Sequence, residues 1–308
     1  MCGILGCAAP SSRSPMIMSR AAPSKAYRWV NPLLDCEAFG EQREIRSFRE
    51  ALQKLADDLL LGKHASHVSI YYRDLNNGPT FGINEKEEFL PASLLKVPLM
   101  VSVYHEAESN PALLDEALTV PPGGDLPNGQ YFSPSSALVA GSTHTVREMA
   151  EAIARRSDNV ATYLLNQRFG LQGMHQLYDM LGVITDDGIP DRLRVKDYAA
   201  IFRILYNASY LNPVYSERIL DALGRSEFRS GITASLPAAV PVAHKYGERL
   251  MDDGRTKQLH DCGIVYYPGH PYLLCVMTRG SDWNTLAAAI DKVSTAVYRE
   301  VSAQFPLK

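Results

Sequence analysis

Hydrophobic positions after the first forty residues predict one helix followed by two strands. Ser47 to Gly62 is expected to be a helix, because it opens with a capping box and its apolar residues recur every three to four positions. His67 to Asp74 alternates in polarity, which is typical of a strand with one apolar side. Asn77-Gly78 is a hairpin signal that leads into a second strand at Thr80 to Asn84.

The rest of the chain reads as a helical block followed by three strands and a helix. Residues from about 93 to 226 are helical in pattern and include a helix capped by Thr145. Val240 to Arg249, His260 to Tyr267 and Tyr272 to Arg279 read as strands separated by glycine-containing turns. A closing helix presents one apolar stripe, formed by Leu286, Ile290, Val293, Val297 and Val301.

This order differs from the strand–helix alternation of a doubly wound protein. It predicts an α/β protein of the α+β kind. An antiparallel five-stranded sheet, flanked by helices, is built from both ends of the chain, and an all-helical domain is inserted. The α/β part is expected at about residues 45–92 and 229–308 and the helical part at about 93–228, together forming one domain over 31–308.

Residues 1–30 differ in composition from the rest of the chain. They are rich in Ser, Ala, Pro and Arg without periodicity, so we expect a disordered tract or a targeting remnant. Ile4-Leu5-Gly6-Cys7 resembles a lipoprotein cleavage box without the apolar stretch that precedes one, and we favour a chance match. Met1-Cys2-Gly3-Ile4 resembles the start of N-terminal-nucleophile amidotransferases, but a Ser/Pro-rich tract follows where strands should come.

Composition narrows the possible functions. The 308 residues are 46% hydrophobic with a formal charge of −3 and no basic block interleaved with aromatics, so no nucleic-acid partner is expected. No apolar stretch approaches the roughly 18 residues that span a bilayer, so no transmembrane span is expected. The histidines lack a ligand spacing such as HExxH, so we expect neither a metal nor another cofactor.

Two of the five cysteines fall on consecutive predicted strands. Cys262 and Cys275 could therefore be neighbours. Two separate buried thiols are favoured over a bridge, because free cysteine packs well in protein cores. The odd number of cysteines leaves at least one thiol free or paired with another chain.

Ser93-Leu94-Leu95-Lys96 is the first of three short motifs suited to chemistry. Pro91 indicates that a helix opens here, which would place Ser93 and Lys96 one turn apart on the same face. A buried lysine in that position can lose its proton and act as general base for the serine hydroxyl. The helix N-terminus would add free N–H groups where an oxyanion forms. Alone, this motif is weak, since a chance match is expected about once in such a chain.

Two further motifs follow in order. Ser157-Asp158-Asn159 comes after the helix capped by Thr145, and alone it would be a helix-end turn with an Asx cap. Lys245-Tyr246-Gly247 lies within a predicted strand, where a lysine usually faces solvent or protects a sheet edge. Separate structural roles do not explain why all three motifs occur in this order.

Ser-x-x-Lys, Ser-Asp-Asn and Lys-x-Gly in this order resemble the signature of the penicillin-recognising serine enzymes, the class A β-lactamases and penicillin-binding proteins. Pro91-Ala92 before Ser93, the Thr145-Val146-Arg147-Glu148 helix start and His260-Asp261-Cys262-Gly263-Ile264-Val265 are also similar to the class A β-lactamase-related family. The resemblance covers about residues 45–305. The fold of that family agrees with the predicted order of elements.

The resemblance implies three catalytic roles. Ser93 would be the acylated nucleophile and Lys96 its proton acceptor. Ser157 would relay a proton to the leaving nitrogen. Two lysines near one serine agree with these roles, because each cation lowers the pKa of the other.

The resemblance also implies the substrate-binding positions. Asn159 would hold the amide of the substrate side chain. Lys245 would set the local field and attract the substrate carboxylate. The backbone N–H of Glu248, the residue after Gly247, would form the oxyanion hole together with that of Ser93.

Two departures from the family pattern bear on the reaction. Tyr246 stands where the family usually has a serine or threonine hydroxyl that helps to hold the substrate carboxylate, so we expect its ring to crowd the site. The loop glutamate that activates the deacylating water is also missing. Between Ser157 and Lys245 the only glutamates are Glu217 and Glu227, and we interpret Glu217 as a helix-face charge.

The loop that would carry this glutamate is expected to be shortened to Gly182 to Arg194. Its acids, interpreted as solvated carboxylates and weak candidates for positioning water, are Asp186, Asp187 and Asp191. The arginine that would meet the substrate carboxylate stays open among Arg249, Arg255 and Arg279.

The leading hypothesis is a serine hydrolase acting on an amide bond, which forms an acyl-enzyme with β-lactam antibiotics. It would be a class A-like β-lactamase with inefficient deacylation. The alternatives are a D,D-peptidase or a slowly turning-over penicillin-binding protein or sensor of the cell wall. A glutaminase on the same fold and a non-catalytic wall-binding module are more remote. We expect a monomer in the cell envelope that acts on a β-lactam or a cell-wall peptide, although no complete signal peptide is present.

Overall fold

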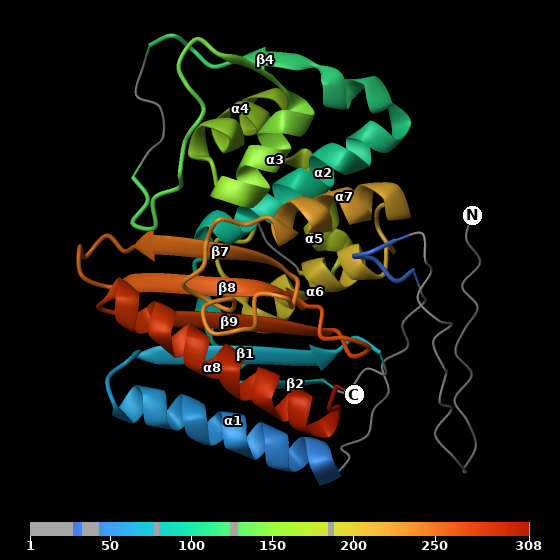
Figure 1. The fold of residues 1–308 in the computed structure, drawn as a ribbon. Coiled ribbons are helices and arrows are strands. Elements are labelled where there is room, and N and C mark those ends of the chain that lie inside the picture. Colours follow the sequence, from blue (N-terminus) through green and yellow to red (C-terminus); the bar gives the residue numbers. More distant parts are fainter. Residues whose placement is uncertain (1–26, 33–42, 77–79, 124–128, 184–187, 308) are drawn as a thin grey trace.

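A five-stranded antiparallel sheet forms the centre of the chain, with helices on both sides (Figure 1). The computed structural model describes residues 27–32, 43–76, 80–123, 129–183 and 188–307. The strands run in the order β2-β1-β9-β8-β7, so strands from the two ends of the chain lie side by side. The predicted fold class is confirmed. Within the described ranges, no helix combines the length and apolar character needed to cross a membrane.

Strand bounds follow the predicted hydrophobic runs closely. The strands are β1 (His67–Asp74), β2 (Thr80–Ile83), β7 (Val242–Leu250), β8 (Lys257–Val265) and β9 (Tyr272–Gly280). β1 matches its prediction at both ends. β8 begins at Lys257 and not at the predicted His260, because Lys257 and Gln258 pair with the end of β9 although their side chains are polar.

β1 is buried on both faces because it lies between β2 and β9. Val68, Ile70 and Tyr72 belong to a core on the side covered by α1 (Arg43–Leu61) and α8 (Trp283–Gln304) (Figure 1). Tyr71 belongs to a second core on the side of the helical block. The sheet therefore separates two hydrophobic cores. The predicted stripe of the closing helix is buried in the first of them.

The helical block covers the other side of the sheet. Its helices are α2 (Lys96–Ser109), α3 (Val146–Arg156), α4 (Asn159–Phe169), α5 (Gln172–Met180), α6 (Val195–Tyr206) and α7 (Pro213–Gly224). Short elements complete it: η1 (Ala92–Leu95), η2 (Pro111–Asp115), β3 (Glu88–Phe89) paired with β6 (Leu193–Arg194), and β4 (Ala117–Thr119) paired with β5 (Thr143–Thr145). The predicted capping box of α3 is present, with reciprocal hydrogen bonds between Thr145 and Glu148.

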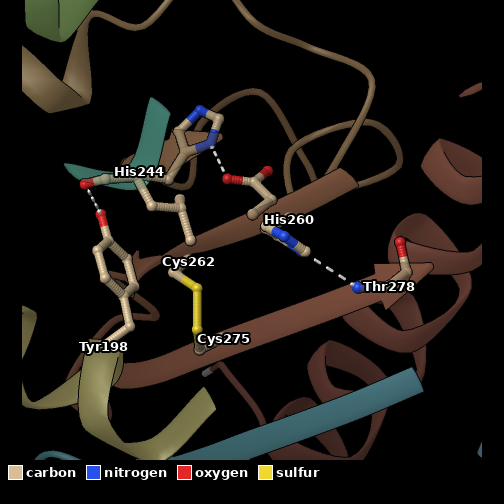
Figure 2. The surroundings of a disulfide bond; sticks show 8 residues. Tyr198, His244, His260, Cys262, Cys275 and Thr278 are labelled. Atoms are coloured by element: carbon tan, nitrogen blue, oxygen red, sulfur yellow. Dashed lines mark hydrogen bonds and ion pairs between the residues drawn. A yellow bond between two sulfur atoms is a disulfide. The ribbon is translucent and has the colours of Figure 1, made fainter. Parts of the chain in front are cut away.

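Cys262 and Cys275 form a disulfide between β8 and β9 (Figure 2). The expectation of two separate thiols was wrong. The strand register places the two residues directly opposite each other, with a Cα–Cα distance of 3.9 Å. Hydrophobic periodicity identifies strands but not their register, so the sequence alone could not decide between neighbours and a bond.

The first described residues dock onto the helical block. Trp29 and Val30 are buried, although they fall inside the tract expected to lack fixed structure. The carboxylate of Glu217 on α7 accepts hydrogen bonds from the backbone N–H groups of Arg28, Trp29 and Val30 at 2.7 to 3.0 Å. Residues 1–26, including both N-terminal motifs, lie outside the described residues.

Candidate active site

Ser93 lies in a tight turn that leads into the buried helix α2. The turn is the 3-10 helix η1, which begins after Pro91, and the α-helix itself starts at Lys96. Ala92, immediately before the serine, has a left-handed backbone with φ of 51°. Such a conformation costs a residue with a side chain about 1 to 3 kcal/mol and persists only where the surroundings impose it. The half-buried Ser93 therefore sits on a turn that neighbouring elements must hold.

Lys96 points from the start of α2 toward the second motif. Its Nζ donates to the Ser157 carbonyl oxygen at 2.5 Å, to Ser157 Oγ at 3.1 Å and to Asn159 Oδ1 at 2.6 Å. Burial lowers the pKa of Lys96 to about 7, although the carboxylates of Asp158 and Glu248 oppose this shift. At neutral pH a substantial fraction of Lys96 is therefore neutral and able to accept a proton.

Ser157 is held between two lysine amines. It caps the C-terminus of α3 with a left-handed backbone, and Asp158 then caps the N-terminus of α4 through the N–H of Ala161. Lys245 Nζ donates to Ser157 Oγ at 2.9 Å, from the side opposite the polypeptide segment that carries Lys96. The second motif is thus both a helix-end turn and a junction of the polar site.

Lys245 projects from β7 into the same cluster and is 1% exposed. Its Nζ also donates to the Tyr246 carbonyl oxygen at 2.7 Å. Burial, together with the neighbouring Lys96 cation, holds the pKa of Lys245 well below its usual range. The predicted edge-strand role is excluded, because this lysine is buried inside the site.

Gly247 allows β7 to approach the turn of Ser93. A Cβ at this position would lie 2.9 Å from the Pro91 carbonyl oxygen and 3.0 Å from the backbone nitrogen of Leu94. Only glycine fits that spacing without a shift of backbone. Glu248 follows directly, and its carboxylate accepts the N–H groups of Tyr131 and Phe132 at 2.5 and 3.2 Å. These bonds attach the loop at residues 129–132 to the end of β7.

All seven residues predicted for the site belong to these connected elements. A cavity of about 530 Å³ opens beside Ser93 and Lys96, and Asn166, Asp191 and Arg249 also line it. Within the described part of the chain, no group of three or more His, Cys, Asp or Glu side chains is arranged to hold a metal.

A model of the β-lactamase enzyme family matches residues 47–301, most of the chain. The chain belongs to the β-lactamase enzyme family. The resemblance inferred from the three motifs is confirmed, and the protein is a serine hydrolase that acts on amide bonds. No curated protein matches the chain.

Solved structures share the fold at low sequence identity. A mutant of PBP-A, solved as an acyl-enzyme complex with penicillin G, is 23% identical, with 86% of this chain and 100% of that chain covered and a TM-score of 0.69. A β-lactamase from Chitinophaga pinensis is 19% identical, with coverage of 83% and 99% and a TM-score of 0.72. A class A β-lactamase from Mycobacterium abscessus is 22% identical, with coverage of 83% and 99% and a TM-score of 0.67.

Tyr246 departs from the family pattern without protruding into the cavity. Its ring is 4% exposed and stacks on Phe228 with a centroid distance of 4.1 Å. Its hydroxyl donates to the Phe132 carbonyl oxygen at 3.2 Å, and Lys245 Nζ lies 4.3 Å from the ring centroid. The ring expected to crowd the site is instead packed beneath the loop at residues 129–132.

The acids considered for deacylation separate clearly. Glu217 binds the N-terminal segment, so it is more than the helix-face charge expected from the sequence. Asp191 lines the cavity beside Ser93 and is exposed. Asp186 and Asp187 lie outside the described residues. Asp191 is therefore the loop acid with a position that can be argued from the structure.

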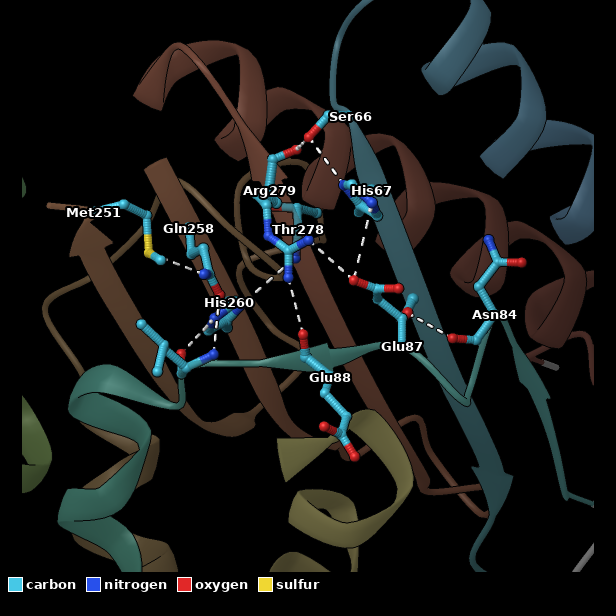
Figure 3. A network of polar contacts seen from close by, with 12 residues as sticks. Ser66, His67, Asn84, Glu87, Glu88, Met251, Gln258, His260, Thr278 and Arg279 are labelled. Carbon is cyan, nitrogen blue, oxygen red and sulfur yellow. Dashed lines mark hydrogen bonds and ion pairs between the residues drawn. The ribbon is translucent and has the colours of Figure 1, made fainter. Parts of the chain in front are cut away.

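The three candidate arginines also separate. Arg249 lines the cavity, whereas Arg279 donates to Glu87 Oε1 at 3.0 Å and to the Glu88 carbonyl oxygen at 2.9 Å (Figure 3). Arg255 lies in the turn between β7 and β8. Arg249 is the best placed of the three to meet a substrate carboxylate.

Two polar residues of the site were missed by sequence reasoning. Gln130 Nε2 donates to the Ser157 carbonyl oxygen at 2.6 Å. Asn166 lines the cavity, and its buried Oδ1 has no hydrogen-bond partner among the described residues. Asn166 follows Asn159 by two helical turns, a spacing that puts both on one face of α4 and could have pointed to it. Gln130 lies in a loop and gives no such signal.

Proposed function

We propose that Ser93 attacks β-lactams to form an acyl-enzyme, which the protein hydrolyses slowly. One observation carries the proposal. Two buried lysine amines converge on Ser157 Oγ, at 3.1 and 2.9 Å, and one of them follows Ser93 by a single turn. A neutral amine beside a serine can take its proton, while a second cation stabilises the charge that develops.

The proposed acylation moves one proton around a short circuit. The Ser93 oxygen bonds to the carbonyl carbon as its proton passes to the neutral Lys96 amine. The carbonyl oxygen then carries negative charge, which the N–H groups of Ser93 and Glu248 would stabilise. When the ring C–N bond breaks, Ser157 gives its proton to the nitrogen and recovers one from Lys96, which returns to its neutral form.

Two contacts favour the proposed mode of substrate binding. Asn159 Oδ1 is occupied by Lys96, which leaves Asn159 Nδ2 to donate to a carbonyl of the substrate side chain. Arg249 at the cavity, with Lys245 behind it, would attract a substrate carboxylate. Both groups belong to the cavity that holds Ser93.

Deacylation is proposed to be slow because the cavity has no glutamate among its described lining residues. Asp191 would be the acid available to orient water. The same observation favours the second candidate function, a D,D-peptidase or a slowly turning-over penicillin-binding sensor of the cell wall. The PBP-A mutant captured as an acyl-enzyme with penicillin G supports a long-lived intermediate on this fold.

We also propose that the protein acts as a monomer outside the cytoplasm, in the cell envelope, with residues 31–308 as the catalytic domain. All proposed catalytic side chains come from one chain, which supports a monomer. The buried disulfide supports an oxidising compartment, since disulfides are rare in reducing cytosol.

The test is a time course of intact mass after mixing the protein with excess benzylpenicillin, with Ser93→Ala as control. We expect an adduct on Ser93 that forms quickly and clears slowly as penicillin is consumed. A permanent adduct would move the function to the sensor or peptidase. Absence of any adduct, or an adduct that persists in Ser93→Ala, would overturn the proposal.

A further inference from the structure

The backbone just before Ser93 is gripped by two buried polar side chains of β8. Leu90 donates its N–H to Gln258 Oε1 at 3.1 Å, and the Leu90 carbonyl oxygen lies 3.1 Å from His260 Nε2. Gln258 and His260 are both 0% exposed. Figure 3 shows them side by side on β8, facing the segment that enters the active-site turn.

The hydrogen-bond chemistry of both side chains is set by further contacts. The backbone N–H of Thr278 donates to His260 Nδ1 at 3.3 Å, so the ring proton must be on Nε2, where it can be donated to Leu90. Gln258 Nε2 faces Met251 Sδ at 3.1 Å, which leaves Oε1 toward the Leu90 N–H. Each side chain therefore matches one backbone group of the same residue.

The far end of the turn is held as well. The hydroxyl of Tyr198 on α6 donates to the Leu94 carbonyl oxygen at 3.0 Å (Figure 2), and Gly247 packs against Pro91 and Leu94. Ala92, with its left-handed backbone, lies between these two anchors. A strained turn relaxes when an anchor is removed, so the anchors determine where the Ser93 hydroxyl points.

We propose that Gln258 and His260 are positioning residues for Ser93. By fixing Leu90 they hold the turn in the conformation that aims the serine hydroxyl at the substrate carbonyl. This inference rests on the proposed role of Ser93 as the nucleophile. Neither side chain lines the cavity, so their removal acts on the chemical step and leaves substrate binding nearly unchanged.

The test compares three variants of the full chain. Gln258→Met keeps the length and burial of the side chain but removes the acceptor for Leu90. Gln258→Glu keeps an oxygen acceptor while placing an acid in a buried position, so it should be the less stable of the two. Ser294→Ala is the matched control, because Ser294 is also fully buried and donates one hydrogen bond to a backbone carbonyl, that of Ile232 at 2.7 Å.

The first readout is acylation of Ser93 by benzylpenicillin, resolved into a first-order rate constant and a half-saturation concentration. In Gln258→Met we expect the rate constant to fall by about 10- to 100-fold and the half-saturation concentration to change by less than about 3-fold. Gln258→Glu should recover much of the rate despite its lower stability. A rate that follows thermal stability across the variants, or a change in Gln258→Met no larger than in Ser294→Ala, would overturn the inference.

The second readout needs no substrate. Amide hydrogen exchange of residues 90–94 should become faster in Gln258→Met and stay unchanged in Ser294→Ala. Unchanged exchange in Gln258→Met would refute the inference whatever penicillin does. If wild-type protein fails to react with penicillin while exchange responds as expected, the proposed function fails and the anchoring role of Gln258 stands.

Discussion

At the scale of single residues, burial sets the charge of the two lysines that meet at Ser157. Lys96 and Lys245 are 5% and 1% exposed, and each cation disfavours the other. A buried ammonium next to another is costly, so one of the two amines gives up its proton near neutral pH. The pKa of Lys96 falls to about 7, which fits a general base that works in water of ordinary pH.

The first prediction concerns the pH dependence of acylation. The neutral amine of Lys96 is the reactive form, so the acylation rate should rise with pH and level off above an apparent pKa near 7. Lys96→Arg keeps a cation that cannot deprotonate and should lower the rate by about 10²- to 10⁴-fold. Stopped-flow measurements with a chromogenic cephalosporin between pH 5 and 9 test both statements.

Lys54→Arg is the control for that experiment. Lys54 is an exposed lysine paired with Asp58 on α1, away from the cavity, and its replacement should leave the pH profile intact. A wild-type profile that is flat between pH 6 and 8 would contradict the role of Lys96 as the base.

At this scale the sequence located the chemistry through types and order of residues. Ser93, Lys96, Ser157 and Lys245 could be predicted because three motifs coincide. Gln258 could not, since its role depends on a backbone group far away in the sequence. The disulfide was missed for a related reason: a strand pattern shows burial along the chain and gives no information on which residue lies across the sheet.

At the scale of elements, the site depends on how closely β7 approaches η1. Gly247 is the point of contact, against the Pro91 carbonyl oxygen and Leu94. Any side chain here would push the strand and the turn apart, and the two proposed oxyanion donors are carried by those two elements. The spacing between secondary structures is thus set by the absence of one carbon atom.

Gly247→Ala should therefore impair catalysis more than folding. We expect the acylation rate to fall by about 10-fold or more, because a displacement near 1 Å is enough to weaken oriented catalysis. Gly123→Ala is the matched control, since a Cβ there meets nothing within 4 Å. Penicillin acylation and urea unfolding are measured on both. An acylation rate in Gly247→Ala equal to that of the control would show that the close approach is not needed.

Elements themselves were largely predictable. β1 and the stripe of α8 follow from strong apolar patterns that match their burial. The turn of Ser93 was less accurately predicted, because a 3-10 segment and a left-handed Ala92 precede the α-helix. The contact with β7 imposes that geometry, and local propensity contains no record of it.

At the scale of the whole molecule, contacts between distant parts of the chain close the structure. The N-terminal segment docks on α7 through Glu217, and Trp29 packs against Tyr266 at the end of β8. A Cβ on Gly224 would lie 2.2 Å from the Trp29 ring, so a glycine makes room for it. The segment before the first helix is therefore part of the folded domain.

Glu217→Ala should release this segment. Three backbone N–H groups lose a charged acceptor, and because they are partly exposed we expect a loss of about 1 to 2 kcal/mol. Limited proteolysis should then cut near Arg28, while acylation of Ser93 stays unchanged because Glu217 does not line the cavity.

Glu300→Ala, on the exposed face of α8, provides the comparison, since its carboxylate contacts Gln304 on the same helix. Urea unfolding should show a smaller loss for it than for Glu217→Ala. Equal stability and equal protease resistance in the two variants would contradict the anchoring role.

The pairing of β1 with β9 also has a consequence for the timing of synthesis. β1 ends at Asp74, but its partner β9 begins only at Tyr272. At the usual 5 to 20 residues per second, the ribosome needs roughly 10 to 40 seconds to make the intervening chain. During that interval β1 and β2 are a two-stranded hairpin with an open edge, which is marginally stable at best. The nascent chain must keep that edge from pairing with others until its last sixth emerges.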